Sequence, residues 1–146
     1  MKRFRFRLQK YLNLKVQQER LARLEVARAR AAYMLEVNRL QEIEEKTGEL
    51  LAQGREALRG SILPELLVLC SSCLQVQERL ACEQQAAVER AKDQLREEQG
   101  ALLRVRQDRR LLERLRMRRW EAYYAEFLRS EQKTLDEIGS ILFTRR

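Results

Sequence analysis

The sequence contains no histidine, one proline and five glycines among 146 residues. Without histidine the chain lacks the commonest general base and the commonest metal ligand. Little proline and glycine leaves little of the chain for loops. No stretch approaches the roughly 20 apolar residues that span a bilayer, since the longest candidate, Ile62 to Leu69, contains Pro64 and Glu65. No apolar signal-peptide core follows the basic N-terminus, so we expect a cytoplasmic protein.

Cysteine is scarce and clustered. Cys70 and Cys73 form a C-x-x-C pair, and Cys82 follows nine residues on. A structural zinc site needs four ligands, and no strand–turn–helix pattern suggests a redox motif. We interpret the cysteines as small residues packing at a bend and expect no metal and no cofactor. Glycine-rich phosphate loops and nucleophile elbows are also missing, so the chain is not predicted to be an enzyme.

Residues that favour helices dominate what is present. Charged residues make up 36% of the chain, above the roughly 25% of an ordinary domain. Apolar residues recur at steps of three and four, as in a coiled coil, whose seam must return every 3.5 residues to keep facing its partner. The first such row is Val26, Ala29, Tyr33, Glu36, Leu40, Ile43, Thr47, Leu50, Gly54 and Ala57. We expect a seam in place of a globular core, partly wet where Glu36, Thr47 and Gly54 interrupt it.

A break in the helix is predicted after Leu58. Arg59-Gly60-Ser61 supplies a C-terminal glycine and a potential N-cap, and Pro64 is tolerated only in a first helical turn. A second row then follows: Val88, Ala91, Leu95, Glu98, Leu102, Val105, Arg109, Leu112 and Arg116. Two seams with a breaker between them predict an all-α fold, a long antiparallel two-helix coiled-coil hairpin.

We expect residues 1–146 to form a single coiled-coil domain. The first helix is predicted over about 8–58, roughly 75 Å long at 1.5 Å per residue. A breaker or short helix is expected over about 59–75, and a long helix over about 76–142. Because the second segment is longer than the first, it either bends near Cys70 to Cys73 or overhangs. We favour the bend, which would form a short third helix at the tip.

Aromatic residues gather near both ends of the chain. Phe4, Phe6 and Tyr11 lie near the start. A third row near the end is Trp120, Tyr124, Phe127, Glu131, Leu135, Ile138 and Leu142. Since a hairpin brings the two ends together, we expect these bulky groups to pack on each other.

Charge is unevenly distributed. Residues 1–35 carry a net charge of +8, residues 36–103 carry −5, residues 104–119 carry +6 and residues 120–146 carry −1. In a hairpin, the end that holds both chain termini, which we call the root, would therefore be positive. The end at the turn, which we call the tip, would be negative. A charged helix surface is often only a solvated face, but mixed-sign pairs would serve solubility equally well. The basic end implies an acidic partner, which would be a protein surface, anionic lipid or nucleic acid.

The arginine run from Arg104 to Arg119 is not expected to bind nucleic acid. A basic leucine zipper needs a regular leucine heptad directly after its basic region, whereas Trp120 and Tyr124 follow here. Stacking aromatics are not interleaved with the run either. The basic start, Met1 to Leu8, is able to contact an anionic membrane, but its apolar face is too short for firm anchoring. We expect peripheral membrane contact as a secondary property.

Both ends of the chain resemble one family. Phe4-Arg5-Phe6-Arg7-Leu8-Gln9-Lys10-Tyr11-Leu12-Asn13-Leu14-Lys15 resembles the opening of the flagellar export protein FliJ family. Glu131-Gln132-Lys133-Thr134-Leu135-Asp136-Glu137-Ile138 resembles its ending. The length, the central breaker and the arginine-rich second helix are also similar, whereas the middle of the chain adds no support.

The resemblance implies a non-enzymatic component of the bacterial flagellar type III protein export apparatus. Such a protein is a coiled-coil stalk that binds the hexameric export ATPase ring and the cytoplasmic domain of the export gate membrane protein. It promotes ATPase assembly, takes part in cycling of export chaperones and thereby serves flagellum biogenesis and chemotaxis. It is cytoplasmic and peripherally associated with the inner face of the cell membrane. Exposed apolar residues near the middle are expected to serve the gate.

The partner-binding surface is predicted at the root. Its residues are Phe4, Phe6, Leu8, Tyr11, Arg109, Arg110, Arg116, Trp120, Tyr124, Phe127, Leu135 and Ile138. Two alternatives stay open. One is the equivalent stalk protein of a virulence type III secretion injectisome, and the other is an RNA-binding or structural coiled-coil scaffold.

Overall fold

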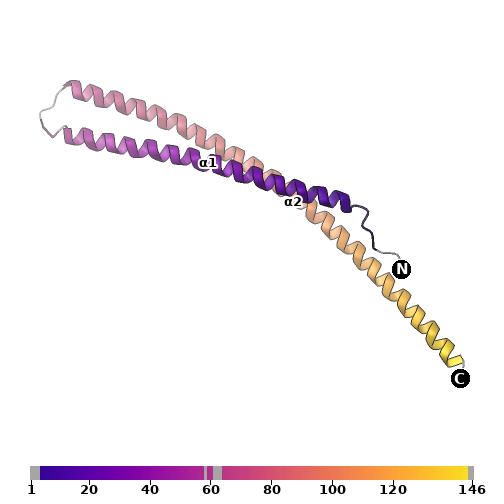
Figure 1. Ribbon diagram of the computed structural model, residues 1–146. Helices are drawn as coiled ribbons and strands as arrows, with labels where there is room; N and C mark the ends of the chain where they lie inside the picture. The colour runs from indigo at the N-terminus through magenta and orange to yellow at the C-terminus, as the bar shows by residue number, and fades with distance from the viewer. Residues whose placement is uncertain (1–3, 58, 61–63, 145–146) are drawn as a thin grey trace. The chain divides into compact units, whose positions relative to one another are not determined.

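Two long helices make up the fold. The computed structural model describes residues 4–57, 59–60 and 64–144, and side chains within these ranges except at positions 142 and 144. Helix α1 spans Gln9–Ala57 and helix α2 spans Pro64–Thr144 (Figure 1). The helices pack against each other, and the described residues form no strand. The predicted all-α helical hairpin is confirmed.

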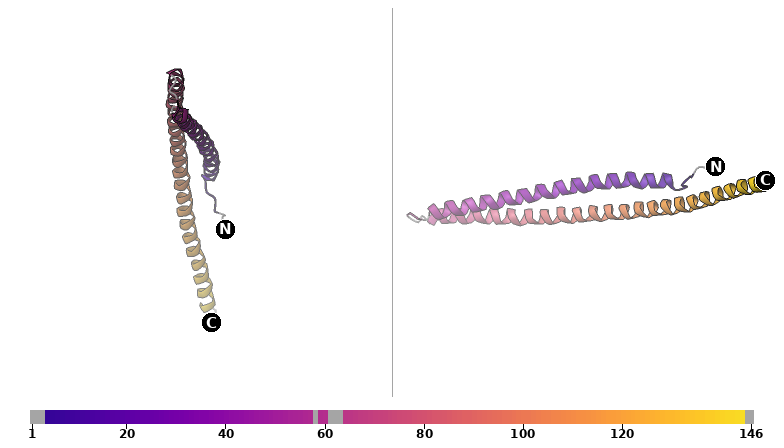
Figure 2. Two further views of the ribbon diagram at one scale, coloured as in Figure 1. Left: turned by 90° about the vertical axis from the view of Figure 1, so that its left-hand side faces the viewer. Right: turned by 90° about the horizontal axis from the view of Figure 1, so that it is seen from below.

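Contacts divide the chain into two compact units, and each joins part of α1 to part of α2. Unit 1 consists of Met1–Arg20 and Leu103–Arg146, and unit 2 consists of Leu21–Leu102. In unit 2 the two helical segments lie side by side and antiparallel on either side of the turn (Figures 1 and 2). The prediction that the whole chain is one domain stays a prediction.

The seam of unit 2 follows the predicted rows. Its less exposed residues on α1 are Ala22, Val26, Ala29, Tyr33, Glu36, Val37, Leu40, Ile43, Thr47, Leu50 and Gly54. Ala29 and Val88 are the two described residues of this unit that are buried, each 8% exposed. Because two helices bury only one stripe each, the core is thin and most seam residues keep some contact with water.

The polar residues Glu36 and Thr47 of the α1 seam have partners. Gln84 Nε2 donates to the backbone oxygen of Glu36 at 2.9 Å and to Oε2 of the same residue at 2.6 Å. Thr47 Oγ1 donates to the Ile43 carbonyl at 2.7 Å. A carboxylate and a hydroxyl are tolerated at these positions because both are hydrogen-bonded and only half-buried. The expectation of polar interruptions in the seam is thus met.

The structure forms no separate third helix over the described residues between 59 and 75. Helix α2 begins at Pro64, in the first turn as predicted, and continues without a break through Cys70 and Cys73. Leu66, Cys70 and Leu74 are half-buried and continue the α2 seam toward the turn. The Ser72 hydroxyl bonds back to the Val68 carbonyl at 2.9 Å, which satisfies it without breaking the helix.

The small residues near the turn therefore allow close packing, not a bend. A methyl group added at Gly54 would lie 3.8 Å from Cys70 Sγ, so helices α1 and α2 pack closely there. The predicted first helix ends within a residue of the observed Ala57, whereas α2 begins at Pro64, about 12 residues before the predicted start of the long second helix near residue 76. The potential N-cap Ser61 lies outside the described residues. Neither helix, over those residues, holds a stretch apolar enough to cross a bilayer.

Replacing Gly48 by alanine should stabilise the chain. Gly48 lies inside α1, and a Cβ built there meets no atom within 4 Å. Glycine inside a helix costs about 0.5–1 kcal/mol relative to alanine. We expect Gly48→Ala to raise the free energy of unfolding by about this amount, measured by urea titration followed by circular dichroism. Gly60→Ala, outside both helices, should give no such gain, and an equal gain at both positions would contradict the explanation.

Candidate partner-binding surface

Most of the positive charge belongs to unit 1. Residues 1–20 and 103–146 contain 19 lysines and arginines and eight acidic residues, a net charge of +11, whereas residues 21–102 sum to −3. The imbalance predicted from the sequence thus coincides with the division into units. Such a charge excess attracts acidic partners over distances of about a Debye length, ~8 Å at physiological ionic strength.

A buried carboxylate organises part of this charge. The Glu19 side chain on α1 is 4% exposed, and its Oε1 accepts a hydrogen bond from Arg106 Nε at 3.1 Å. Arg109 Nε lies 2.6 Å from Glu19 Oε2, and the terminal Nη1 of Arg109 donates to Glu113 at 2.7 Å. Arg109 Nε lacks hydrogen-bond alignment, so its contact with Glu19 is mainly electrostatic. A carboxylate this buried requires opposite charge nearby, which both arginines supply.

A second cross-helix pair lies one turn away. Lys15 Nζ donates to Asp108 Oδ2 at 2.8 Å. This hydrogen bond to Asp108 raises the pKa of Lys15 above its usual 10.5. The stability that the charged Lys15 contributes through this pair is therefore present up to about pH 10.5 and is lost as the pH rises through the raised pKa. Nearer the end of α1, Arg116 Nη1 approaches Gln9 Oε1 at 3.5 Å.

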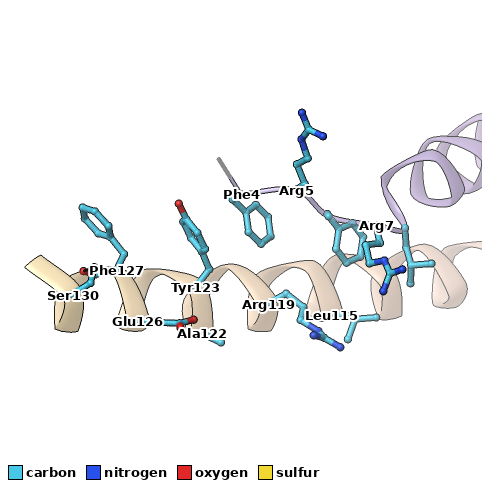
Figure 3. A pocket seen from close by; sticks show the side chains of 12 residues that line it. Phe4, Arg5, Arg7, Leu115, Arg119, Ala122, Tyr123, Glu126, Phe127 and Ser130 are labelled. Atoms are coloured by element: carbon cyan, nitrogen blue, oxygen red, sulfur yellow. Dashed lines mark hydrogen bonds between the residues drawn. The ribbon is translucent and has the colours of Figure 1, made fainter. Parts of the chain in front are cut away.

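The segment before α1 lies over one face of α2. Phe4 and Tyr123 point toward one another with ring centroids 5.6 Å apart (Figure 3). The two segments border an open groove lined also by Phe6, Arg119 and Phe127. Phe4, Phe6, Tyr123 and Phe127 are half-buried by this packing. The predicted packing between aromatic groups of the two chain ends is confirmed for Phe4.

A different face of α2 is exposed over the residues that the structure describes. Every described side chain from residue 128 onward is exposed, because α1 begins only at Gln9. The apolar residues on this face are Met117, Trp120, Tyr124, Leu128, Leu135 and Ile138, which are 44–62% exposed. We call this set the open stripe. With Glu131 included, its members follow each other at steps of three and four, so they share one side of the helix.

The predicted surface residues do not form one continuous surface. Trp120, Tyr124, Leu135 and Ile138 belong to the open stripe, and Phe4, Phe6 and Phe127 border the groove. Leu8 also lines the groove, while Tyr11 lies on α1 and is 48% exposed, with the Lys15 ammonium 5.6 Å from its ring centroid. Arg110 and Arg116 are exposed, and Arg109 joins the Glu19 cluster. Their roles in partner binding remain predictions.

Sequence reasoning missed Glu19, Arg106, Lys15 and Asp108. A signal for Glu19 was present, because stepping back from Val26 by four and three places residue 19 in the seam. Leu128 and Met117 were missed as well. The prediction followed the row that starts at Trp120, whereas the exposed face also includes Met117 before it and Leu128 within it.

The structure is a helical hairpin with exposed apolar and basic surfaces. The profile of the family described as flagellar FliJ protein matches residues 4–146, so the chain belongs to that family. A solved structure of a putative YscO homologue from Chlamydia trachomatis has the same fold, with a TM-score of 0.71 and 20% identity over 97% of this chain and 96% of that one. A comparison with curated protein sequences gives no match.

Family membership identifies the chain as a stalk-like protein associated with a type III export apparatus, as the resemblance of its two ends implied. Proteins of this kind are structural components of export and are not known as enzymes.

Removing the Glu19 carboxylate should weaken unit 1. Glu19→Ala leaves two arginines facing a cavity in the seam, and we expect the free energy of unfolding to fall by about 2 kcal/mol. This loss is smaller than the roughly 3–5 kcal/mol for breaking a fully buried pair, because both arginines reach water. Glu25→Ala removes an exposed carboxylate that pairs with Arg28 on its own helix, and should cost less than about 0.5 kcal/mol. Urea unfolding of both variants tests this, and equal losses would show that burial of Glu19 contributes nothing.

Proposed function

We propose that the chain is the stalk of a flagellar type III export ATPase complex. Unit 1 binds the hexameric export ATPase ring and promotes its assembly and turnover. Unit 2 binds the cytoplasmic domain of the export gate. Through these contacts the protein is held at the inner face of the cell membrane and takes part in export and in chaperone cycling.

The open stripe is the observation that carries the ATPase part of the proposal. A helix face with apolar residues at steps of three and four is the surface that another helix or an apolar collar packs against. The side chains from Met117 to Ile138 leave this face uncovered over about six turns of α2 at 3.6 residues per turn. Exposed apolar surface of this extent on one helix face favours a protein partner.

The basic residues around the stripe favour fast and oriented association with an acidic partner. Arg110 and Arg116 are exposed and lie next to the start of the stripe. Charges at the rim of an interface raise the association rate more than the affinity. Arg109, which was also predicted to belong to the partner-binding surface, is held by Glu19 and Glu113, so its substitution would also disturb packing.

Unit 2 offers a separate surface for the gate. Leu69, Val76 and Leu80 are 60%, 55% and 42% exposed, and the exposed Cys73 lies between them at the same steps of four, three and four. These residues share one face of α2, beside the seam. The unit has a net charge of −3, so it would not compete for the acidic partner of unit 1.

The stalk protein of a virulence injectisome is the second candidate. It would use the same fold, and the likeness to the putative YscO homologue, at 20% identity, supports the fold alone. The flagellar assignment is preferred because the family profile that matches is the flagellar one.

Stimulation of the cognate export ATPase should depend on the open stripe. We expect the wild-type chain to raise ATP hydrolysis and the hexamer fraction seen by sedimentation. Leu135→Ser together with Trp120→Ser should raise the concentration for half-maximal stimulation at least about tenfold, because two central apolar contacts are lost. Leu111→Ser is the matched control, since Leu111 and Leu135 are both 62% exposed but only Leu135 belongs to the stripe. Stimulation unchanged in the double variant would refute docking through the stripe.

Binding of the gate should depend on the surface of unit 2. Leu69→Ser with Val76→Ser should reduce capture of the purified cytoplasmic domain of the gate by about tenfold or more while leaving ATPase stimulation intact. Leu135→Ser should have the opposite pattern. Equal binding of the gate domain to both variants would show that the gate does not bind this surface.

A further inference from the structure

The first half of the open stripe is surrounded by arginine. Residues 114–120 read Arg-Leu-Arg-Met-Arg-Arg-Trp, with four arginines and no carboxylate, and Glu113 and Glu121 border this run, so that arginines outnumber carboxylates by four to two over residues 113–121. At 100° per residue, Arg114 lies on one edge of the stripe and Arg116 on the other. Within the described part of the chain, Arg114 and Arg118 have no carboxylate within ion-pair distance. Four arginines on two turns of helix repel one another, so an anionic surface would stabilise them.

The apolar centre of this half is aromatic. The Trp120 and Tyr124 rings stack at 5.1 Å between centroids with 5° between their planes, and they are 45% and 44% exposed. Coiled-coil seams favour aliphatic knobs that fit the holes of a partner helix. Tryptophan and tyrosine, with an apolar body and a polar edge, are instead enriched at the interface between lipid and water.

We propose that the face formed by Met117, Trp120 and Tyr124, with its flanking arginines, binds the surface of an anionic phospholipid bilayer directly. The helix lies in the plane of the interface, the aromatic rings enter the headgroup region, and the arginines contact lipid phosphates. This interaction goes beyond the proposed function, because it needs neither the ATPase nor the gate.

The second half of the stripe does not share this chemistry. Leu135 and Ile138 lie among Glu131, Asp136 and Glu137, whose carboxylates repel anionic headgroups. The stripe therefore has an arginine-flanked half that suits lipid as well as protein, and a carboxylate-flanked half that suits protein alone. A single-stranded nucleic acid is the less favoured anion, because the two rings stack on each other and leave no gap for a base between them.

The chain reports on this interaction by itself, because Trp120 is its one tryptophan. Vesicles of phosphatidylglycerol and phosphatidylcholine should shift Trp120 emission to the blue, and bromine on the lipid acyl chains should quench it. Vesicles of phosphatidylcholine alone should do neither. The binding should weaken as salt is raised, since screening reduces the attraction between arginine and phosphate.

Arg114→Gln with Arg118→Gln should reduce partition into the anionic vesicles by about thirtyfold, from about fivefold for each arginine near the surface. The matched control is Arg55→Gln with Arg79→Gln, two exposed arginines of unit 2, which removes the same charge and should change partition by less than about twofold. Circular dichroism of each variant verifies that the helices are retained.

Unchanged Trp120 emission with anionic vesicles would overturn the proposal. So would equal losses in the two double variants, which would indicate attraction by net charge alone. Tighter binding to an RNA homopolymer than to vesicles would assign the surface to nucleic acid instead. Leu135→Ser should leave vesicle binding intact while weakening ATPase stimulation, so a failure of this inference is distinguishable from a failure of the proposed stalk function.

Discussion

The carboxylate of Glu19, held between Arg106 and Arg109 across the seam, is the interaction on which unit 1 depends most. Two helices alone bury little apolar surface, and Leu12 is the one described apolar residue of this unit that is fully buried. Apolar contacts of this kind tolerate a slip along the seam, whereas a buried charge does not, because a slip would leave it without its partners. A buried polar group of this kind fixes register in coiled coils at some cost in stability.

Much of the fold was predictable because the packing of a coiled coil requires apolar residues at regular steps of three and four along the sequence. The row from Val26 to Gly54 is the observed seam of α1. The break near Gly60 and the start of α2 at Pro64 follow from backbone chemistry that is local to those residues. The prediction of a short third helix was wrong because small residues from Cys70 to Cys73 were taken as evidence of a bend. Cys70 instead packs against Gly54, and the Ser72 hydroxyl donates to a carbonyl of its own helix.

The surface was harder to predict than the seam. Spacing shows that Trp120 and Tyr124 share a helix face, but it does not show whether α1 reaches far enough to cover them. Exposure depends on where α1 begins, at Gln9, and on which side of α2 the segment before it crosses. That segment contacts Tyr123, one residue away from Tyr124 but about 100° around the helix, so neighbouring tyrosines have different surroundings.

The arginine-rich part of α2 therefore has two roles that its composition does not separate. Arg106 and Arg109 face α1 and balance Glu19, so their charge is used within the fold. Arg114 and Arg118 lie past the point where α1 can supply carboxylates, and their charge faces outward. Unit 1 carries more positive charge than its packing against Glu19 requires. The excess positive charge lies beside the exposed apolar residues. A surface that combines unbalanced charge with uncovered apolar groups is stabilised by an acidic partner that also has an apolar part, as both a protein collar and a lipid headgroup layer do.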